Sequence, residues 1–248
     1  MGEGRPGVYL HVGRRRGDCG RRIVTDSPIS GLFDLLEEDM MGTDRNLQTR
    51  IGPSGLGTTC DRCLVHGLAE TPQYRHPNWW AGAGTAIHEW CEGAILRHAG
   101  RVLRSAPAGE STEVEWLPEN RITVGNVLDV KISGTADVFH VPSGTVGDFK
   151  CLGKSSLEKL KRGNVKAIYR RQLMLYWRGY ENEGYTVNHV ALIGIPRDAK
   201  SIRDGSVITM PYDRMEAETV LKRASVWLWL TRTNGLEATL GQAGEHNR

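Results

Sequence analysis

The spacing of apolar residues predicts several helices along the chain. The best defined runs from Gly84 to His98, where apolar residues recur at helical intervals: Ile87, Trp90, Cys91, Ala94 and Ile95. Asp213 is suited to cap the last predicted helix, which extends to about Thr231. The remaining helices are predicted over residues 28–41 with Ser27 as the candidate cap, from within Cys60–Leu68, and over 155–183 with a break near Gly163. Residues 42–58 and 71–83 are predicted to be irregular.

Alternating or β-branched apolar residues predict strands between these helices. Residues 112–117 alternate, with Glu113 and Glu115 on the polar side. Residues 127–141 and 145–150 flank the turn signal Pro142-Ser143-Gly144 and predict a hairpin. Two further strands are predicted over 187–195, before Pro196, and over 206–212. This order of elements predicts an α/β fold in which helices flank a central mixed β-sheet.

Length and composition favour one large domain with two tails. The chain has 248 residues, of which 39% are hydrophobic. We predict a basic flexible arm over 1–26, one domain over 27–232 and a flexible tail over 233–248; the arm contains Arg14, Arg15, Arg16, Arg21 and Arg22. No window approaches the roughly 18 apolar residues of a membrane span, and the first residues do not resemble a signal peptide. We therefore expect a cytoplasmic protein with no membrane partner.

Two carboxylates and a lysine lie on the strands of the predicted hairpin. Asp148 and Lys150 share a face because side chains alternate along a strand. Asp137 joins that face, opposite Lys150, if the loop has two residues or the four from Pro142 to Thr145. A three-residue loop would turn Asp137 away, and we predict the even register. By themselves, these three residues are more typical of a polar surface strand than of a site.

Three further features favour a site over a polar surface. His88, one turn into the helix predicted from Gly84, is a suitable ligand for Mn²⁺, although a lone helical histidine is more often structural. Glu113 and Glu115 offer additional carboxylates. Tyr169, Gln172 and Tyr176 share one helical face, which suits contact with a phosphate, a base or a metal-bound water. The alternative for this face is a half-buried amphipathic surface.

Four short motifs in order resemble those of the PD-(D/E)XK nucleases. They are Gly-Thr-Ala-Ile-His at 84–88, Gly-Thr-Ala-Asp at 134–137, Asp-Phe-Lys at 148–150 and Gln-x-x-x-Tyr at 172–176. The pattern is most similar to the RecB-like exonuclease branch, which includes CRISPR-associated RecB-like exonucleases and phage recombination nucleases. The resemblance spans about residues 55–195 and implies a restriction-endonuclease-like core.

The resemblance also implies a role for each matching residue. His88, Asp137, Asp148 and the carbonyl of Phe149 would bind Mg²⁺ or Mn²⁺. Lys150 would orient or activate the attacking water, and Gln172 and Tyr176 would position the strand or that water. Independently of any family, carboxylates together with histidine make an oxygen-rich site and not a structural zinc site.

The cysteines raise the separate question of a second metal. Cys60-Asp61-Arg62-Cys63 has the spacing of half a metal site, and relatives in the resembling branch hold an iron–sulfur cluster with three cysteines near the C-terminus. This chain has no cysteine after Cys151, which disfavours the cluster. An iron–sulfur or zinc site from Cys60, Cys63 and Cys91 with Cys151 or His66 stays open as an alternative.

Aromatic and basic residues supply candidate DNA contacts. Trp79 and Trp80 could stack on unpaired bases or could plug the edge of the core. A basic stretch follows the hairpin and could neutralise phosphates or form a solvated face; it contains Lys154, Lys159, Lys161, Arg162, Lys166, Arg170 and Arg171.

The leading hypothesis is a metal-dependent DNA exonuclease that hydrolyses phosphodiester bonds on single-stranded or end-exposed DNA in recombination, replication or repair. Its partners would be DNA and recombination or helicase proteins. The alternative is a non-catalytic DNA-binding or scaffold subunit of a recombination or CRISPR adaptation complex. The intact set of Asp137, Asp148 and Lys150 favours the enzyme, because a binding protein has no need of all three.

Overall fold

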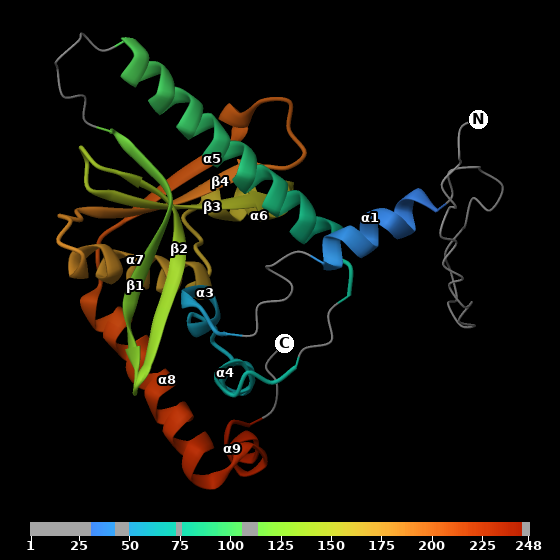
Figure 1. Cartoon of the computed structure of the whole chain (residues 1–248), viewed down its shortest axis with the longest axis vertical. Helices are drawn as coiled ribbons and strands as arrows, with labels where there is room; N and C mark the ends of the chain where they lie inside the picture. Colours follow the sequence, from blue (N-terminus) through green and yellow to red (C-terminus); the bar gives the residue numbers. More distant parts are fainter. Residues whose placement is uncertain (1–30, 43–49, 73–75, 106–113, 245–248) are drawn as a thin grey trace, which may run out of the picture.

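The computed structural model describes residues 31–42, 50–72, 76–105 and 114–244, with the side chains of 103–105 excepted. Figure 1 shows a central β-sheet with helices packed around it and a long β1–β2 hairpin that reaches toward α8. The helices are α1 (Leu32–Met41), α3 (Pro53–Leu56), α4 (Asp61–Leu68), α5 (Trp79–Ser105), α6 (Lys154–Lys161), α7 (Ala167–Asn182), α8 (Arg214–Asn234) and α9 (Leu236–Gln242), with a short 3-10 turn at Ile202–Asp204. The strands are β1 (Trp116–Val127), β2 (Val130–His140), β3 (Thr145–Leu152), β4 (His189–Pro196) and β5 (Ser206–Met210).

The sheet is mixed, with its strands in the order β1-β2-β3-β4-β5. Only the β3–β4 pair is parallel; the other three pairs are antiparallel. Parallel neighbours require a crossover connection, which α6 and α7 supply here. The predicted α/β fold with a mixed sheet flanked by helices is therefore confirmed.

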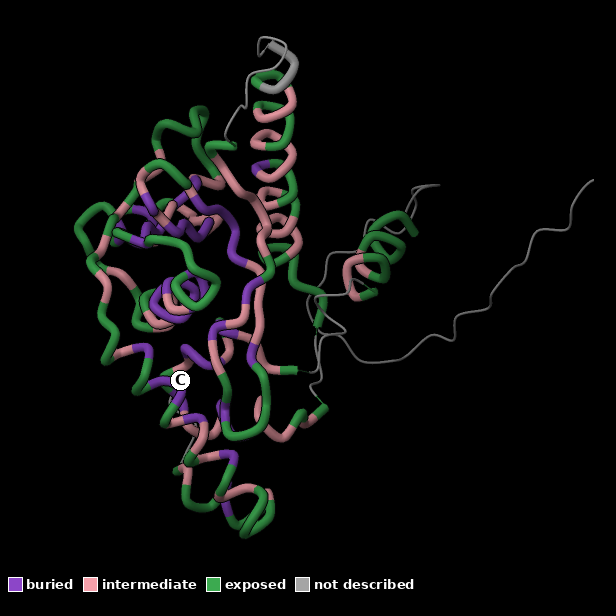
Figure 2. Tube along the Cα trace, turned by 60° about the vertical axis from the view of Figure 1, so that its left-hand side comes forward, coloured by how far each residue is buried: buried purple, intermediate pink, exposed green. Residues whose placement is uncertain are grey.

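Successive residues of β3 point to two different cores, one on each face of the sheet. Phe149 packs with Val138 and with Cys91 of α5. Val146 belongs to the larger core, which contains Leu173 and other buried residues of α7 together with residues of α8. Figure 2 shows α7 as a mostly buried helix and α5 as a helix with an exposed outer side. Since Asp148 alternates with Phe149, its side chain lies on the α7 face.

Several predicted elements are confirmed with small changes in their bounds. The side chain of Cys60 caps α4, and that of Asp213 caps α8 by accepting the Glu216 amide at 3.0 Å. Gly163, at φ +78°, lies between α6 and α7, where the break was predicted. The N-terminal arm, Ser27, Cys19 and Glu113 lie outside the described residues.

Other predictions were wrong. Helix α5 starts at Trp79 in the segment expected to be irregular, because the Asn78 side chain caps it by accepting the amides of Trp80 and Ala81. Helix α3 forms within the loop predicted over 42–58. The flexible tail predicted from 233 is instead helical through the end of α8 and over α9, where Leu240 is buried and its carbonyl accepts a hydrogen bond from Arg62.

The strand predicted over 112–117 is displaced. Val114 and Glu115 precede β1, which begins at Trp116 and continues to Val127. Its polar middle resembles a loop in sequence, but this part pairs with β2 along most of its length. Long-range pairing, which local composition does not encode, thus decides the strand.

The loop of the β2–β3 hairpin has an even number of residues, as predicted, but the loop residues differ from the predicted ones. His140 pairs with Thr145, so the loop is Val141–Gly144 and not Pro142–Thr145. Counting along both strands from this pair, Asp137 comes opposite Asp148 and not opposite Lys150. The two carboxylates still share a face, because an even loop length was retained.

Within the described residues, the structure has no helix that is both long enough and apolar enough to cross a bilayer. The predicted cytoplasmic location stays a prediction.

Candidate active site

The candidate site lies where β2 and β3 separate. Their pairing ends at Val138 and Gly147, so the Phe149 amide lies beyond the last paired residues. That amide donates a hydrogen bond to Oδ2 of Asp137, with a distance of 2.6 Å. The Asp137 carboxylate thus replaces a strand contact, which fixes its position relative to β3.

Asp148 is fully buried and is held by two neighbours. Gln172 of α7 donates to its Oδ1 at 2.9 Å, and Lys150 Nζ lies 2.5 Å from its Oδ2. Despite this ion pair, Oδ2 has no hydrogen bond of normal geometry. Burial raises the pKa of Asp148 to about 6, while the positive charge of Lys150 opposes the shift.

His88 comes from the opposite face, on α5, and meets Asp137 at the opening between the strands. Its Nδ1 lies 3.4 Å from Oδ1 of Asp137. Burial lowers the pKa of His88, but the hydrogen bond and the charge of Asp137 outweigh burial and raise the pKa above its usual value. The packing of α5 on the sheet therefore brings His88 of the helix into contact with Asp137 of β2.

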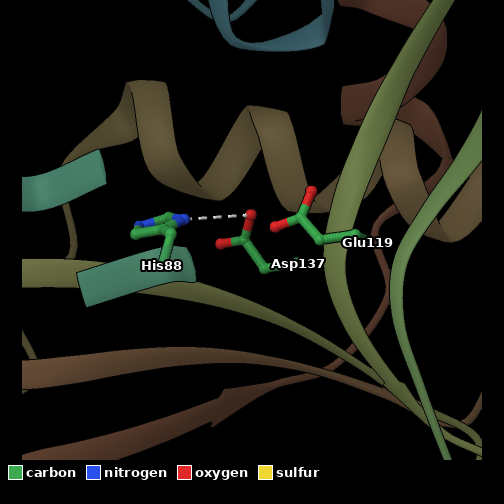
Figure 3. A group of neighbouring side chains, drawn as sticks. All are labelled: His88, Glu119 and Asp137. Carbon is green, nitrogen blue, oxygen red and sulfur yellow. Dashed lines mark ion pairs between the residues drawn. The ribbon is translucent and has the colours of Figure 1, made fainter. Parts of the chain in front are cut away.

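Glu119 is a site residue that the sequence analysis missed. The ligand atoms of His88, Glu119 and Asp137 all lie within 4.8 Å of one another. Figure 3 shows the Asp137 carboxylate between the His88 ring and the Glu119 carboxylate. Glu119 lies on β1 between the pairs Pro118–Val138 and Asn120–Ala136, so it comes opposite Asp137, and its φ is +47°. The local sequence Pro118-Glu119-Asn120 is as typical of a loop as of a strand, so it gave no signal that Glu119 would face Asp137.

The donor set fits a hard divalent cation. Asp137, Glu119 and Asp148 provide oxygens, and His88 provides one imidazole nitrogen, which is acceptable to Mn²⁺ and Mg²⁺. Two carboxylates so close together repel each other unless a positive charge compensates them. The buried Oδ2 of Asp148, which lacks a hydrogen bond, is a further acceptor in the same place.

Gln172 and Tyr176 are held close to the carboxylates from α7. The Tyr176 hydroxyl donates to the carbonyl of Thr135 at 2.7 Å, next to the Gly134-Thr135-Ala136-Asp137 segment. Burial raises the pKa of Tyr176 well above its usual range, and the charge of Asp148 adds to this shift. Tyr176 therefore stays protonated and acts as a donor. Tyr169, about two turns before Tyr176 on α7, places its ring 5.2 Å from Lys150 Nζ.

These side chains line one cleft of about 1200 Å³, which we call the acidic cleft. It contains His88, Glu119, Asp137, Asp148, Lys150, Gln172 and Tyr176. Its outer lining includes the cationic residues Arg50, Arg121 and Lys131, which can attract an anionic substrate toward the carboxylates, and also Glu89 and Glu92. The cleft thus combines a cation-binding floor with cationic residues in its outer lining.

Other candidates lie elsewhere. Glu115 pairs with His140 at 3.1 Å and does not line the acidic cleft. Cys60 and Cys63 lie together at the start of α4, Cys91 of α5 packs into the smaller core, and Cys151 lies on β3. Among the described residues, the only metal-compatible group of three or more contains no cysteine. The alternative site from Cys60, Cys63, Cys91 and Cys151 or His66 is therefore not assembled.

The candidate DNA contacts fall into two groups. Trp79 and Trp80 are 70% and 59% exposed, so they do not plug the core. Lys154 is exposed near the end of β3. By contrast, Arg170 and Arg171 are both engaged by Glu216 of α8, at 2.9 and 3.8 Å.

At the C-terminal end of α6, the predicted DNA contacts Lys161 and Arg162 are exposed. Lys161 pairs with Glu158 at 3.5 Å. DNA contact by Lys161, Arg170 or Arg171 would compete with these ion pairs.

No family model and no curated protein sequence matches this chain. Among solved structures, the chain is similar to SSO0001, with a TM-score of 0.50 and 15% identity over 82% of this chain and 88% of that one. It is also similar to LHK-Exo, an alkaline exonuclease from Laribacter hongkongensis, alone and in complex with dAMP. Both LHK-Exo comparisons give a TM-score of 0.47 and 14% identity over 78% of this chain and 91% of that one. At such identities the likeness concerns the fold alone.

Proposed function

We propose that this protein is a metal-dependent deoxyribonuclease, with an exonuclease acting on single-stranded or end-exposed DNA as the specific form. One observation carries the proposal: Asp137 lies between His88 and Glu119 and is hydrogen-bonded to the Phe149 amide, next to the buried Asp148–Lys150 pair. This grouping supports phosphodiester hydrolysis because it combines cation ligands with an ammonium group in one cleft.

Each residue has a defined task under this proposal. Asp137, Asp148, His88 and Glu119 would hold Mg²⁺ or Mn²⁺, which when bound stabilises charge on the scissile phosphate and acidifies a bound water. Lys150 supplies a positive charge at 2.5 Å from Asp148 and is placed to orient the water or the phosphate. Gln172 keeps the Asp148 carboxylate in one orientation by its hydrogen bond.

The choice of an exonuclease, of DNA ends and of a role in recombination, replication or repair rests on the resemblance of the four motifs to the RecB-like branch. The carbonyl of Phe149 is proposed as a further ligand on the same ground. Arg50 and Arg121 in the outer lining of the acidic cleft support a polyanionic substrate independently of that resemblance.

Digestion of end-labelled single-stranded and duplex DNA with Mg²⁺ or Mn²⁺ tests the proposal. We expect metal-dependent cleavage by the wild type and a loss of at least about 10³-fold in Asp137→Ala and Lys150→Ala. Asp129→Ala is the matched control, since this aspartate pairs with Arg232 outside the acidic cleft. Cleavage that survives in both site variants would refute the assigned site, and metal-independent binding without cleavage would favour the non-catalytic alternative.

A further inference from the structure

A second cleft, of about 1060 Å³, opens at the end of β3 and along α6. We call it the basic groove. Four cationic side chains line it: Lys154, Lys159, Lys166 and Arg197. Its two carboxylates are Glu158 and Asp198, so the groove has an excess of positive charge. The proposed chemistry in the acidic cleft makes no use of it.

The basic groove adjoins the acidic cleft through one pair of side chains. Lys150 lines the acidic cleft, and Tyr169 lines the basic groove. The Lys150 ammonium lies 5.2 Å from the centre of the Tyr169 ring, and Lys166 approaches the same ring at 5.7 Å. A strand that crosses the acidic cleft at Lys150 can therefore continue over Tyr169 into the groove.

The two carboxylates of the groove have partners of their own. Glu158 pairs with Lys161, which is not among the residues lining the groove, at 3.5 Å. Asp198 accepts the backbone amide of Lys154 at 3.4 Å. Because the side chains of Lys154, Lys159 and Lys166 are exposed, phosphate groups can reach them at little desolvation cost.

An exposed tryptophan lies against Arg197, one of the residues that line the groove. The Arg197 guanidinium lies 3.4 Å from the centre of the Trp80 ring, while Trp80 remains 59% exposed. This stack links the start of α5 to the segment after β4. A guanidinium placed over an indole can still offer N–H donors to a phosphate, and the exposed part of the indole can stack on a base.

We propose that the basic groove binds the backbone of a single polynucleotide strand next to the scissile phosphate. Lys154, Lys159 and Lys166 contact its phosphates, and the Trp80–Arg197 pair holds the next nucleotide by stacking and by a charged hydrogen bond. This inference deepens the proposed nuclease function and rests on it. A single strand is favoured over a duplex because base stacking on Trp80 requires an unpaired base.

The test measures binding separately from chemistry. Fluorescence anisotropy with a labelled 20-nucleotide single strand, in Ca²⁺ and over a range of salt concentrations, compares the wild type with Lys154→Gln/Lys159→Gln/Arg197→Gln. We expect the triple variant to bind at least about ten-fold more weakly at low salt, with a salt slope reduced by about 2, since each lost phosphate contact removes about 0.7. Trp80→Leu should weaken binding by about five-fold or more, with little change in the slope.

Matched controls exclude a general charge effect. Arg214→Gln/Lys222→Gln removes two charges on α8, outside the groove lining, and should bind as the wild type does. Thermal unfolding followed by circular dichroism verifies that each variant is folded. A blunt duplex of the same length should lose less affinity than the single strand in Trp80→Leu, and an equal loss would overturn the preference for an unpaired strand.

Hydrolysis of bis(p-nitrophenyl) phosphate with Mn²⁺ distinguishes failure of the groove from failure of the nuclease. This small ester has no strand to occupy the groove, so the triple variant should hydrolyse it at the wild-type rate. If the triple variant binds the strand as tightly as the wild type, the groove proposal is wrong whatever the ester shows. If the wild type hydrolyses neither ester nor DNA but the binding differences hold, the nuclease proposal fails and the groove remains.

Discussion

The acidic cleft and the basic groove adjoin at the Lys150–Tyr169 contact, but their charged groups lie in opposite environments. In the acidic cleft, Asp148 is fully buried and Asp137 is 8% exposed, so their charges depend on close partners. In the basic groove, the side chains of Lys154 and Lys159 are exposed to solvent. Burial therefore raises the pKa of Asp148. The exposed groove lysines can bind phosphates with little desolvation cost, but burial does not fix the positions of their ammonium groups. This difference suits the acidic cleft to the proposed hydrolysis of the phosphodiester and the basic groove to holding the polynucleotide strand.

The largest expected effect comes from Asp148→Asn. We expect at least about 10³-fold loss of cleavage, together with a gain in stability of about 1–3 kcal/mol for the metal-free protein at pH 7–8. The gain arises because ionising a carboxyl whose pKa is raised to about 6 by burial opposes folding. Denaturant unfolding in EDTA, combined with a cleavage assay, measures both.

The stability difference between Asp148→Asn and the wild type should depend on pH, because the pKa of Asp148 differs between the folded and unfolded states. The folded-state pKa of Asp148 lies above its usual value of 3.8, so the folded wild type binds more protons than the unfolded chain between these values. The gain in the free energy of unfolding of Asp148→Asn over the wild type should be complete above pH 7. It should shrink as the pH falls from about 6 toward 4. An advantage that is constant over this range would contradict the assignment. Asp129→Asn, at an exposed aspartate, should give no such gain.

A smaller loss is expected for Gln172, which touches Asp148 and not the substrate. Gln172→Met keeps the volume but removes the 2.9 Å hydrogen bond, and we expect about a 10- to 100-fold loss in activity or metal affinity. Gln172→Glu adds a negative charge and should shift the acid limb of the pH–rate profile upward. Equal profiles for both variants would show that this residue only fills space.

Glu119 should affect metal binding more than folding. We expect Glu119→Gln to weaken Mn²⁺ binding by about ten-fold in calorimetry. Glu119→Gly should lose metal similarly but gain up to about 1 kcal/mol of stability by relieving the φ of +47°. Leu128→Gly is the control: it has a φ of +53° in the β1–β2 turn, so it should gain stability without any change in Mn²⁺ affinity.

The smallest effect on DNA is expected at the engaged arginines. Arg171 contacts Glu216 and donates to the Thr58 carbonyl at 3.3 Å. Arg171→Gln should therefore lower stability by about 1 kcal/mol and change strand affinity by less than two-fold. If Arg171→Gln lost as much strand affinity as substitution of a groove lysine, Arg171 would have to be a DNA contact.

Local sequence patterns predicted the elements that carry the site. The β-branched runs on both sides of the Pro142 turn signal gave the hairpin, and its even parity placed Asp137 and Asp148 on one face. The four-residue spacing of Gln172 and Tyr176 gave their shared helical face, which meets the carboxylates. These features depend on strand alternation and helical periodicity, which neighbouring residues impose on one another.

Long-range packing decided what those patterns left open. Glu119 joins the site because β1 extends beyond its predicted end and pairs with β2, in a register that brings Glu119 opposite Asp137. Arg197 and Trp80 are 117 positions apart in the sequence, and only the packing of α5 beside β4 stacks them. Residues in the predicted tail form the end of α8 and α9, and burial of the Leu240 side chain stabilises this arrangement.

The sequence by itself determined the alternation that aligns Asp137, Asp148 and Lys150 and the helix that carries His88. Only the tertiary structure decided that Glu119 completes the group, that no cysteine joins a metal-compatible group of three or more among the described residues, and that a basic groove adjoins the acidic cleft at Tyr169. The physical reason is the range of the interactions: strand and helix periods are local, whereas burial, charge pairing and stacking depend on which distant segments the fold brings into contact.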